Sequence, residues 1–419
     1  MSTSSKRFAA LLVGALLVGL GKAAHAIDDN VLRASLEGEA DEKISGFLTE
    51  EEAYEEQAII DYVQSVVDSL GGQGRYSAFL VHTDEVYASG LANKTILVTT
   101  SLMARLANEA QLAMVIAHEL VHVKREHLLV IKRAEIAEEN RRSSGGFGDL
   151  LGRAGDIAVA SGAISSITGT SSGAVSAGVS TANTVNVAIE SVQASMASAG
   201  PDGLGEELED DADKYSVRYL KDANYDTQMA ASAWELLGKY SGSLDDRYFY
   251  GNPEALAERS KNTIKLAKKY DNDDGRGSSS DAYCKNIFEV STLVAREDLD
   301  ANRFKSAKSA IDCALLAKPE DPRTRYLNGV VLRETARSRS DYREAIDEFS
   351  FVLELIPKQG STHREIGYTY REVDDFELAL YHLNKYLELR PNAKDANEVA
   401  TAVEQINATL NSTEADEDW

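Results

Sequence analysis

The sequence has few cysteines, no excess of basic residues and, after its first 26 residues, no long hydrophobic run. Only two of its 419 residues are cysteine, which leaves little scope for a metal site built on thiolates. Acidic residues outnumber basic ones by 68 to 44, a formal net charge of −24. That balance argues against binding to nucleic acid or to anionic membrane surfaces. A helix that spans a bilayer needs about 20 apolar residues, so we expect no integral membrane span after the N-terminal segment.

The first 26 residues have the pattern of a cleavable export signal. Lys6 and Arg7 form a short basic region, residues 8–20 are apolar, and residues 24–26 read A-H-A, a typical cleavage site. No cysteine stands in this segment or just after it for attachment of a lipid. We therefore predict a signal peptide over residues 1–26, cleavage after Ala26 and a periplasmic location. Cleavage would remove three basic residues and no acidic one, which lowers the net charge to −27.

The two cysteines leave two possibilities open. In an oxidising compartment Cys284 and Cys313 could bridge neighbouring antiparallel helices. They could equally be two buried thiols, because their spacing does not give the separation of their Cα atoms.

Hydrophobic periodicity predicts the elements of the first half. Residues 27 to about 70 have the pattern of an acidic, amphipathic helix that Gly71-Gly72 would end. Two short apolar runs, 78–81 and 96–98, are separated by turn-forming residues and predict strands. From Glu109 onward a helix is predicted that has no polar face before Lys124, which is typical of a core helix.

Residues 144–203 differ from the rest, because no charged residue occurs between Asp156 and Glu190 and small residues dominate. Bulky apolar residues are too few for a membrane span. The segment could be a low-complexity linker or a flexible hairpin of small residues.

The C-terminal part repeats itself, as "FKSAKSAIDCALLAKP", "YREAIDEFSFVLELIP" and "FELALYHLNKYLELRP" show. In each copy an aromatic residue precedes a small residue by three positions, and a proline follows that residue by 12. The period is 38 and then 34 residues, which fits an insertion at "RSRS". The pattern resembles the tetratricopeptide repeat, in which paired helices cross at small residues. It predicts an all-α solenoid over residues 281–411, with a capping helix at about 393–411 and an acidic tail at 412–419.

The stretch "AHELVHVKREH" contains H-E-x-x-H. On a helix His118 and His122 lie one turn apart on the same face, so both imidazoles can reach one ion. Glu119 lies close enough to hold a water that a metal ion activates and to take its proton. His127 lies roughly 140° from His122 on a continuous helix and cannot easily join that ion. A third ligand should therefore come from a later helix.

The order of "HELVHVKREH", a Gly/Ala/Ser-rich segment and "ELEDDAD" resembles the gluzincin metallopeptidase family of the CAAX prenyl protease and the heat-shock membrane protease. Among its members, those with tetratricopeptide repeats that assist β-barrel assembly in the periplasm are the most similar. The resemblance implies an α+β, mostly helical, zincin-type catalytic domain over residues 27–270, followed by the repeat domain. It also implies Zn²⁺, and it favours a lid or hairpin for residues 144–203.

The register of the resemblance selects the third ligand. Aligning "NYD" and Ser216 with the family pattern places Asp211 on the ligand position, so the predicted metal ligands are His118, His122 and Asp211, with Glu119 as the catalytic base. Glu209 is the alternative third ligand. Asp213 would accept a hydrogen bond from a ligand histidine and fix its tautomer.

Two departures from the family pattern occur. The N-A-x-x-x-P-G-G stretch before the motif is absent, and Asn252 stands where relatives have a histidine that can approach the metal. Arg259 is retained; it could meet an oxyanion or an acidic group near the metal, or form a structural salt bridge.

These observations predict an exported zinc metalloendopeptidase that acts on misfolded or stalled envelope proteins. The repeats would bind the substrate or a partner in outer-membrane assembly. The alternative is a repeat-containing chaperone whose catalytic domain has decayed. Asp211 and Asn252 favour this alternative, and the intact H-E-x-x-H favours the enzyme.

Overall fold

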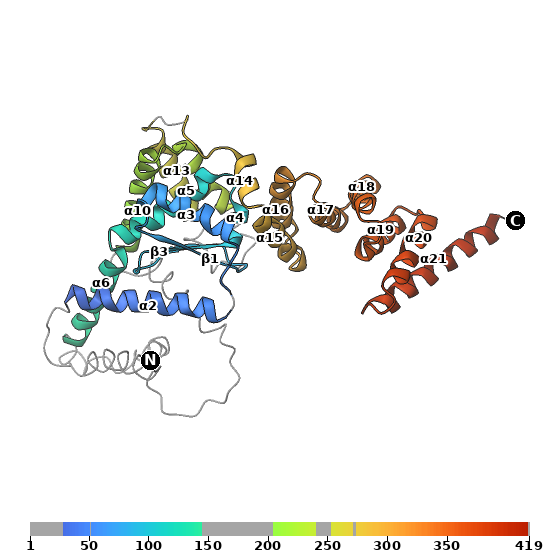
Figure 1. The fold of residues 1–419 in the computed structure, drawn as a ribbon, viewed down its shortest axis with the longest axis horizontal. Coiled ribbons are helices and arrows are strands. Elements are labelled where there is room, and N and C mark those ends of the chain that lie inside the picture. The colour runs from blue at the N-terminus through green and yellow to red at the C-terminus, as the bar shows by residue number, and fades with distance from the viewer. Residues whose placement is uncertain (1–27, 51, 145–203, 240–252, 271–273, 418–419) are drawn as a thin grey trace, which may run out of the picture. The chain divides into compact units, whose positions relative to one another are not determined.

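The structure, a computed structural model, describes residues 28–50, 52–144, 204–239, 253–270 and 274–417 (Figure 1). The predicted signal peptide, Asn252 and all but the first residue of the 144–203 segment lie outside these ranges. Contacts between Cα atoms divide the chain into two units. In the first unit (residues 1–42 and 126–205), Arg33 forms a bidentate ion pair with Glu126, with both N–O distances at 2.8 Å. The second unit (residues 43–125 and 206–419) contains all the elements described below from α3 onward, except α6 and the first two residues of α10.

The predicted helix over residues 27–70 is in fact two helices, α2 (Asp29–Thr49) and α3 (Gln57–Gly71). Between them the chain is extended and pairs with the first strand, where the amide of His82 donates to the carbonyl of Glu52 at 2.7 Å. This pairing satisfies the backbone outside a helix, and it explains the break. Gly72 ends α3 with a φ of 96°, as the predicted stop requires.

A three-stranded sheet supports the site. It consists of β1 (Ser77–Val81), β2 (Ala88–Gly90) and β3 (Thr95–Thr99) in the order β1-β3-β2. β1 pairs with β3 in parallel, whereas β2 pairs with β3 antiparallel and lies at the edge. The two predicted strands are β1 and β3, and β2 was not predicted.

Helices α3, α4 (Thr100–Arg105) and α5 (Glu109–Lys124) lie on the same side of this sheet (Figure 1). The side chain of Asn108 caps α5, and all residues from 110 to 122 are buried, so the prediction of a core helix is confirmed. The helix ends earlier than its apolar pattern does. Glu126 has a φ of 54°, in the left-handed region, and α6 (His127–Ser144) begins directly after it.

Four further helices complete the surroundings of α5: α10 (Leu204–Asp222), α11 (Thr227–Ala231), α12 (Ala233–Gly238) and α13 (Pro253–Ala267). The hydroxyl of Ser216 in α10 lies 3.7 Å from the sulfur of Met114 in α5. Helices α11 and α12 also pack against α5.

The C-terminal part consists of successive antiparallel helices (Figure 1). They are α14 (Ser280–Asn286), α15 (Phe288–Asp300), α16 (Phe304–Ala317), α17 (Pro322–Thr335), α18 (Arg339–Leu355), α19 (Gly360–Glu372), α20 (Phe376–Leu389) and α21 (Ala396–Glu417). A Cβ atom on Gly329 would lie 2.5 Å from the ring of Phe349 in the next helix. The region is therefore the tetratricopeptide-repeat solenoid that the sequence predicted, with small residues where its helices cross.

The insertion lengthens one helix of the solenoid. Helix α18 has 17 residues, whereas α16 and α20 have 14 each. The additional turn precedes Tyr342, and Ser338 and Asp341 form a capping box at its start.

The first repeat, formed by α15 and α16, shares a hydrophobic core with the sheet and its helices. A single cluster of buried residues includes side chains from Ile59 in α3 to Val331 in α17. Cys284 in α14 and Cys313 in α16 form a disulfide, with Cα atoms 5.2 Å apart, which selects the first of the two possibilities. Arg105 in α4 and Asp298 in α15 form an ion pair with both side chains fully buried.

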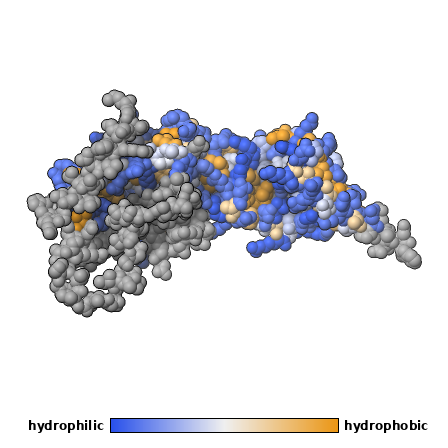
Figure 2. Space-filling model, turned by 90° about the horizontal axis from the view of Figure 1, so that it is seen from below, coloured by the Kyte–Doolittle hydropathy of each residue, from blue (hydrophilic) through white to orange (hydrophobic). Residues whose placement is uncertain are grey.

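On the face shown in Figure 2, hydrophobic residues form small patches among hydrophilic ones. Within the described ranges, no helix has the length and apolarity needed to cross a membrane.

Candidate metal centre

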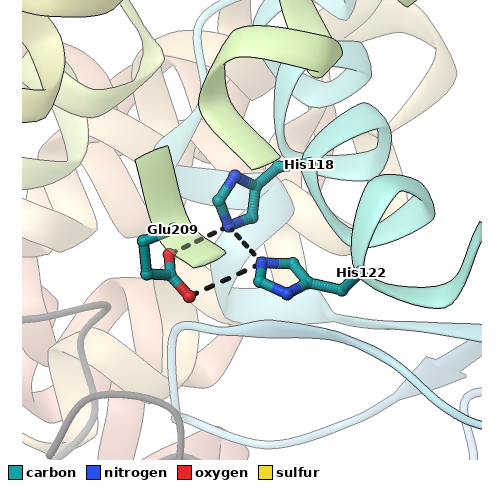
Figure 3. A group of neighbouring side chains, drawn as sticks. All are labelled: His118, His122 and Glu209. Atoms are coloured by element: carbon teal, nitrogen blue, oxygen red, sulfur yellow. Dashed lines mark hydrogen bonds and ion pairs between the residues drawn. The ribbon is translucent and has the colours of Figure 1, made fainter. Parts of the chain in front are cut away.

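Three side chains meet at the end of the motif helix (Figure 3). His118 and His122 project from successive turns of α5 and are 0% and 2% exposed. Their Nε2 atoms lie 3.0 Å apart. Glu209, from α10, places one carboxylate oxygen 3.1 Å from Nε2 of His118 and the other 3.5 Å from Nε2 of His122. The three groups face a common point.

Asp211 does not take part in this group. Its carboxylate forms an ion pair with Arg125. Each residue of a helix advances by about 100°, so Asp211 lies about 160° around α10 from Glu209. The structure therefore brings Glu209, and not Asp211, to the two histidines, which corrects the predicted register in favour of its alternative.

Asp213 lies four residues after Glu209 and shares its face of α10. One of its oxygens lies 2.9 Å from Nδ1 of His118, so His118 donates from Nδ1 and directs Nε2 towards Glu209 and His122. Arg259 of α13 donates two hydrogen bonds to Asp213, both at 2.9 Å, and its Nη2 lies 3.3 Å from a Glu209 oxygen. Of the predicted roles for Arg259, the structure shows contact with acidic groups.

Trp234 packs against two of these residues, Arg259 and His118. Its ring lies 4.3 Å from the guanidinium carbon of Arg259 and 5.3 Å, edge to face, from the ring of His118. Trp234 was not predicted as a site residue, and no motif of the sequence marks it.

The charges in the site compensate one another despite their burial. Burial lowers the pKa of His118, but Glu209 and Asp213 outweigh this effect and raise the pKa to about 9. Burial raises the pKa of Glu209, but His118 and Arg259 hold it well below the ordinary range. The pKa of Asp213 is lowered in the same way, with Arg259 as the main counter-charge to burial. Both carboxylates are therefore ionised, the form that binds a cation.

The backbone of β2 holds Glu119. The amide of Gly90 donates a hydrogen bond to Oε2 of Glu119 at 2.7 Å. A Cβ atom on Gly90 would lie 2.6 Å from both the carbonyl oxygen of Glu119 and the side chain of Val123. Only glycine therefore allows β2 to lie this close to α5. Sequence analysis missed this contact, although a glycine within a strand often marks close approach of another backbone.

His127 lies outside the group, as predicted, but the predicted angle on a continuous helix is not the reason. The helix does not continue from His122 to His127, because α5 ends at Lys124. Among the described residues, His118, His122 and Glu209 form the single group whose ligand atoms all lie within 4.8 Å of one another.

The three residues fit a metal ion of tetrahedral preference. Ligand atoms 2.0–2.1 Å from such an ion lie about 3.3–3.4 Å from each other. The two Nε2 atoms lie 3.0 Å apart, and the nearest oxygen of Glu209 to each of them, a different one in each case, lies at 3.1 and 3.5 Å, close to this distance. Two imidazoles and one carboxylate leave a fourth position open, as catalytic zinc sites do.

A core helix that carries H-E-x-x-H, a carboxylate from a later helix and a sheet edge beside the motif together define a metallopeptidase. Comparison with protein families matches residues 53–267, just over half of the chain, to Peptidase family M48. The chain belongs to this family.

Two curated proteins resemble a shorter part of the chain. Anaphase-promoting complex subunit CDC16 of Saccharomyces cerevisiae is 32% identical over 112 residues, which is 26% of this chain and 13% of that protein. Cell division cycle protein 27 homolog A of Arabidopsis thaliana is 23% identical over 107 residues, which is 26% of this chain and 14% of that protein. Both matches fit the repeat region. They cover 13% and 14% of the relatives, so the chain spans only a small part of their length.

Proposed function

We propose that the protein is an exported zinc-dependent metalloendopeptidase that hydrolyses peptide bonds in misfolded or stalled envelope proteins. The observation that carries this proposal is the buried group of His118, His122 and Glu209 on and beside the helix that holds Glu119. Membership of Peptidase family M48 supports the reaction class.

Zinc is the metal that the site fits best. Two imidazoles and one carboxylate are a known ligand set for catalytic zinc. Asp213 fixes the tautomer of His118, and Arg259 in turn orients Asp213. Such supporting groups raise metal affinity, because they hold the ligands in the binding geometry before the ion arrives.

The chain supplies the base for hydrolysis. When bound, zinc would polarise the substrate carbonyl and lower the pKa of the attacking water towards about 7. Glu119 accepts the proton of that water and returns it to the nitrogen of the cleaved peptide bond. The hydrogen bond from Gly90 to Oε2 holds the carboxylate in one orientation, so that it need not be ordered during the reaction.

The proposed location and substrates have separate support. The N-terminal pattern of a signal peptide favours export, and a disulfide is expected in an oxidising compartment such as the periplasm. The repeat region offers an extended surface for a protein segment. One of the proteins that it resembles is by name a subunit of a complex, which agrees with a role in protein binding. We assign it the binding of unfolded envelope proteins or of an outer-membrane assembly partner.

The test is cleavage of an unfolded protein by the purified, zinc-loaded chain. We expect cleavage, its loss on chelation, and its recovery when zinc is restored. Glu119→Gln should abolish cleavage and retain zinc, whereas Glu235→Gln, at an exposed position of α12, should cleave normally. A zinc-loaded wild-type protein that cuts no unfolded substrate would contradict the proposal.

The second candidate is a chaperone without protease activity, which the Asn252 departure favours. The Asp211 departure no longer supports it, because the structure provides the glutamate that the family pattern requires. A protein that prevents aggregation of an unfolded substrate equally well with and without zinc, and never cleaves it, would establish this candidate.

A further inference from the structure

The loop over residues 82–87 connects β1 to β2 and therefore determines where β2 begins. Three residues after the loop, the amide of Gly90 holds the carboxylate of Glu119. Tyr87, the last residue of the loop, is fixed to the sheet, because its amide donates to the hydroxyl of Thr99 at 3.2 Å. Only three residues separate the end of the loop from the amide that holds the proposed catalytic base. A displacement of the loop should therefore also move that amide.

The first repeat holds this loop by two ion pairs. Nε2 of His82 lies 2.9 Å from a carboxylate oxygen of Glu297, near the end of α15. One residue beyond Thr83, the carboxylate of Asp84 lies 3.1 Å from Nη1 of Arg303, at the start of α16. The loop is thus attached to both helices of the repeat.

Arg303, the partner of the loop on the repeat side, is itself held by a buried ion pair. Arg303 also donates to Asp298 at 2.8 Å, and Asp298 is the buried partner of Arg105 in α4. From the other side, the hydroxyl of Ser101 in α4 donates to the carbonyl of Thr83 at 2.7 Å. The loop therefore lies between α4 and the first repeat, with hydrogen bonds to each.

We propose that the His82–Glu297 pair is an acid-strengthened latch through which the first repeat sets the position of β2 and, with it, the orientation of Glu119. The regulatory meaning of the latch rests on the proposed role of Glu119 as the catalytic base. The latch itself is a property of the fold and can be measured without activity.

The groups around His82 favour its charged form. Glu297 faces it from α15, Glu52 from the segment before α3, and the hydroxyl of Thr100 from α4, 3.4 Å from Nδ1. Asp84 and Glu85 belong to its own loop, and Arg303, the cation that contacts this loop through Asp84, is also paired with Asp298.

The sign of the pH dependence follows from these neighbours. The hydrogen bond with Glu297 raises the pKa of His82 above its ordinary value of 6.5, burial opposes the shift, and Glu52 adds to it. The ion pair is therefore fully formed below about pH 6.5 and is lost as the pH rises through the raised pKa. The ion pair should therefore hold the loop more strongly at acidic pH than at alkaline pH.

Amide hydrogen exchange of the segment 83–91, corrected for the intrinsic effect of pH, tests the latch. The full chain with Glu119→Gln avoids self-cleavage and keeps an acceptor for Gly90. We expect exchange to be several-fold faster at about pH 8.5 than at about pH 6, while the segment 57–71 in α3 shows no such change. With Glu297→Gln or His82→Gln added, this difference should disappear.

The matched control is Asp281→Asn, which breaks an exposed pair with Lys285 in α14 and should leave the pH difference intact. Two results would overturn the proposal. One is an equal corrected exchange rate of the segment 83–91 at both pH values, and the other is a pH difference in that rate that persists in the Glu297→Gln variant. Neither result would affect the proposed peptidase activity, and an inactive protein would still report on the latch.

Discussion

At the scale of the residue, the site depends on partners that are distant in sequence and adjacent in space. His118 is oriented by Asp213, and Asp213 by Arg259, so a single chain of hydrogen bonds links α5, α10 and α13. The buried carboxylates of Glu209 and Asp213 each have Arg259 within 3.3 Å, and an opposite charge at this distance is the condition for keeping ions in a protein interior.

A pair of histidines in the repeat region makes a prediction for acid stability. Nε2 of His363 donates to the carbonyl of Pro357 at 3.0 Å, and Nδ1 of His363 lies 2.9 Å from Nδ1 of His382. Burial and the neighbouring His363 lower the pKa of His382 from 6.5 to about 4. In the window between these values the unfolded chain binds a proton at this residue and the folded chain does not. Stability at this residue should therefore be lost as the pH falls.

We expect His382→Gln to reduce the loss of unfolding free energy between about pH 7 and about pH 5, measured by urea denaturation. Gln can still donate to His363, so the comparison isolates the titration. An equal loss in both proteins would show that the histidine pair does not contribute.

The choice of the third ligand on α10 shows what the sequence could and could not predict at the scale of the residue. H-E-x-x-H fixed the two histidines and Glu119, because a helix of known spacing presents them together. The third ligand was misplaced, because the alignment relied on downstream residues. A helical argument was available: Asp213 and a ligand on the same helix must share a face, and the residue four positions earlier is Glu209. Trp234 could not be predicted, since its role arises only from packing, and Gly90 gives a signal only where β2 is already known to be a strand.

At the scale of the element, close crossings determine which residues the helices tolerate. Gly329 faces the ring of Phe349, and Gly367 faces Leu383, where an added Cβ atom would lie 2.8 Å away. The repeats were predictable because this requirement recurs in each copy. The edge strand β2 was not, because three residues are too few to show a periodicity. The break between α2 and α3 was hidden as well, because it results from pairing with β1.

Gly329→Ala should destabilise the protein by about 1–3 kcal/mol, because Phe349 is fully buried and has no space in which to move. The control is Gly46→Ala in α2, where no atom lies within 4 Å of an added Cβ. That substitution should stabilise the protein by up to about 1 kcal/mol, since alanine favours the helix. The measurement is chemical denaturation of both variants. An unchanged free energy of unfolding in Gly329→Ala would show that the two helices do not cross closely at this residue.

At the scale of the whole molecule, the first repeat belongs to the same core as the sheet and the motif helix. The buried hydrophobic cluster is continuous, Tyr283 donates to the carbonyl of Met103 at 2.8 Å, and the Arg105–Asp298 pair is buried between α4 and α15. The sequence indicated two regions by their different periodicities. It contained no sign of this shared core, which depends on contacts between residues almost 200 positions apart.

Asp298→Ala should lower the unfolding free energy by about 3–5 kcal/mol, because it leaves Arg105 buried without its counter-charge. Asp281→Ala, which breaks the exposed pair with Lys285, should cost about 1 kcal/mol or less. Thermal or chemical denaturation of the full chain measures both. Similar small effects for the two substitutions would mean that the buried pair does not hold the repeat to the sheet.

The most direct test of the metal centre is the zinc content of the purified chain and of two variants of α10. The structure predicts one zinc per chain in the wild type and in Asp211→Ala, and almost none in Glu209→Ala, because only Glu209 faces His118 and His122. Zinc retained by Glu209→Ala and lost from Asp211→Ala would contradict the site described here.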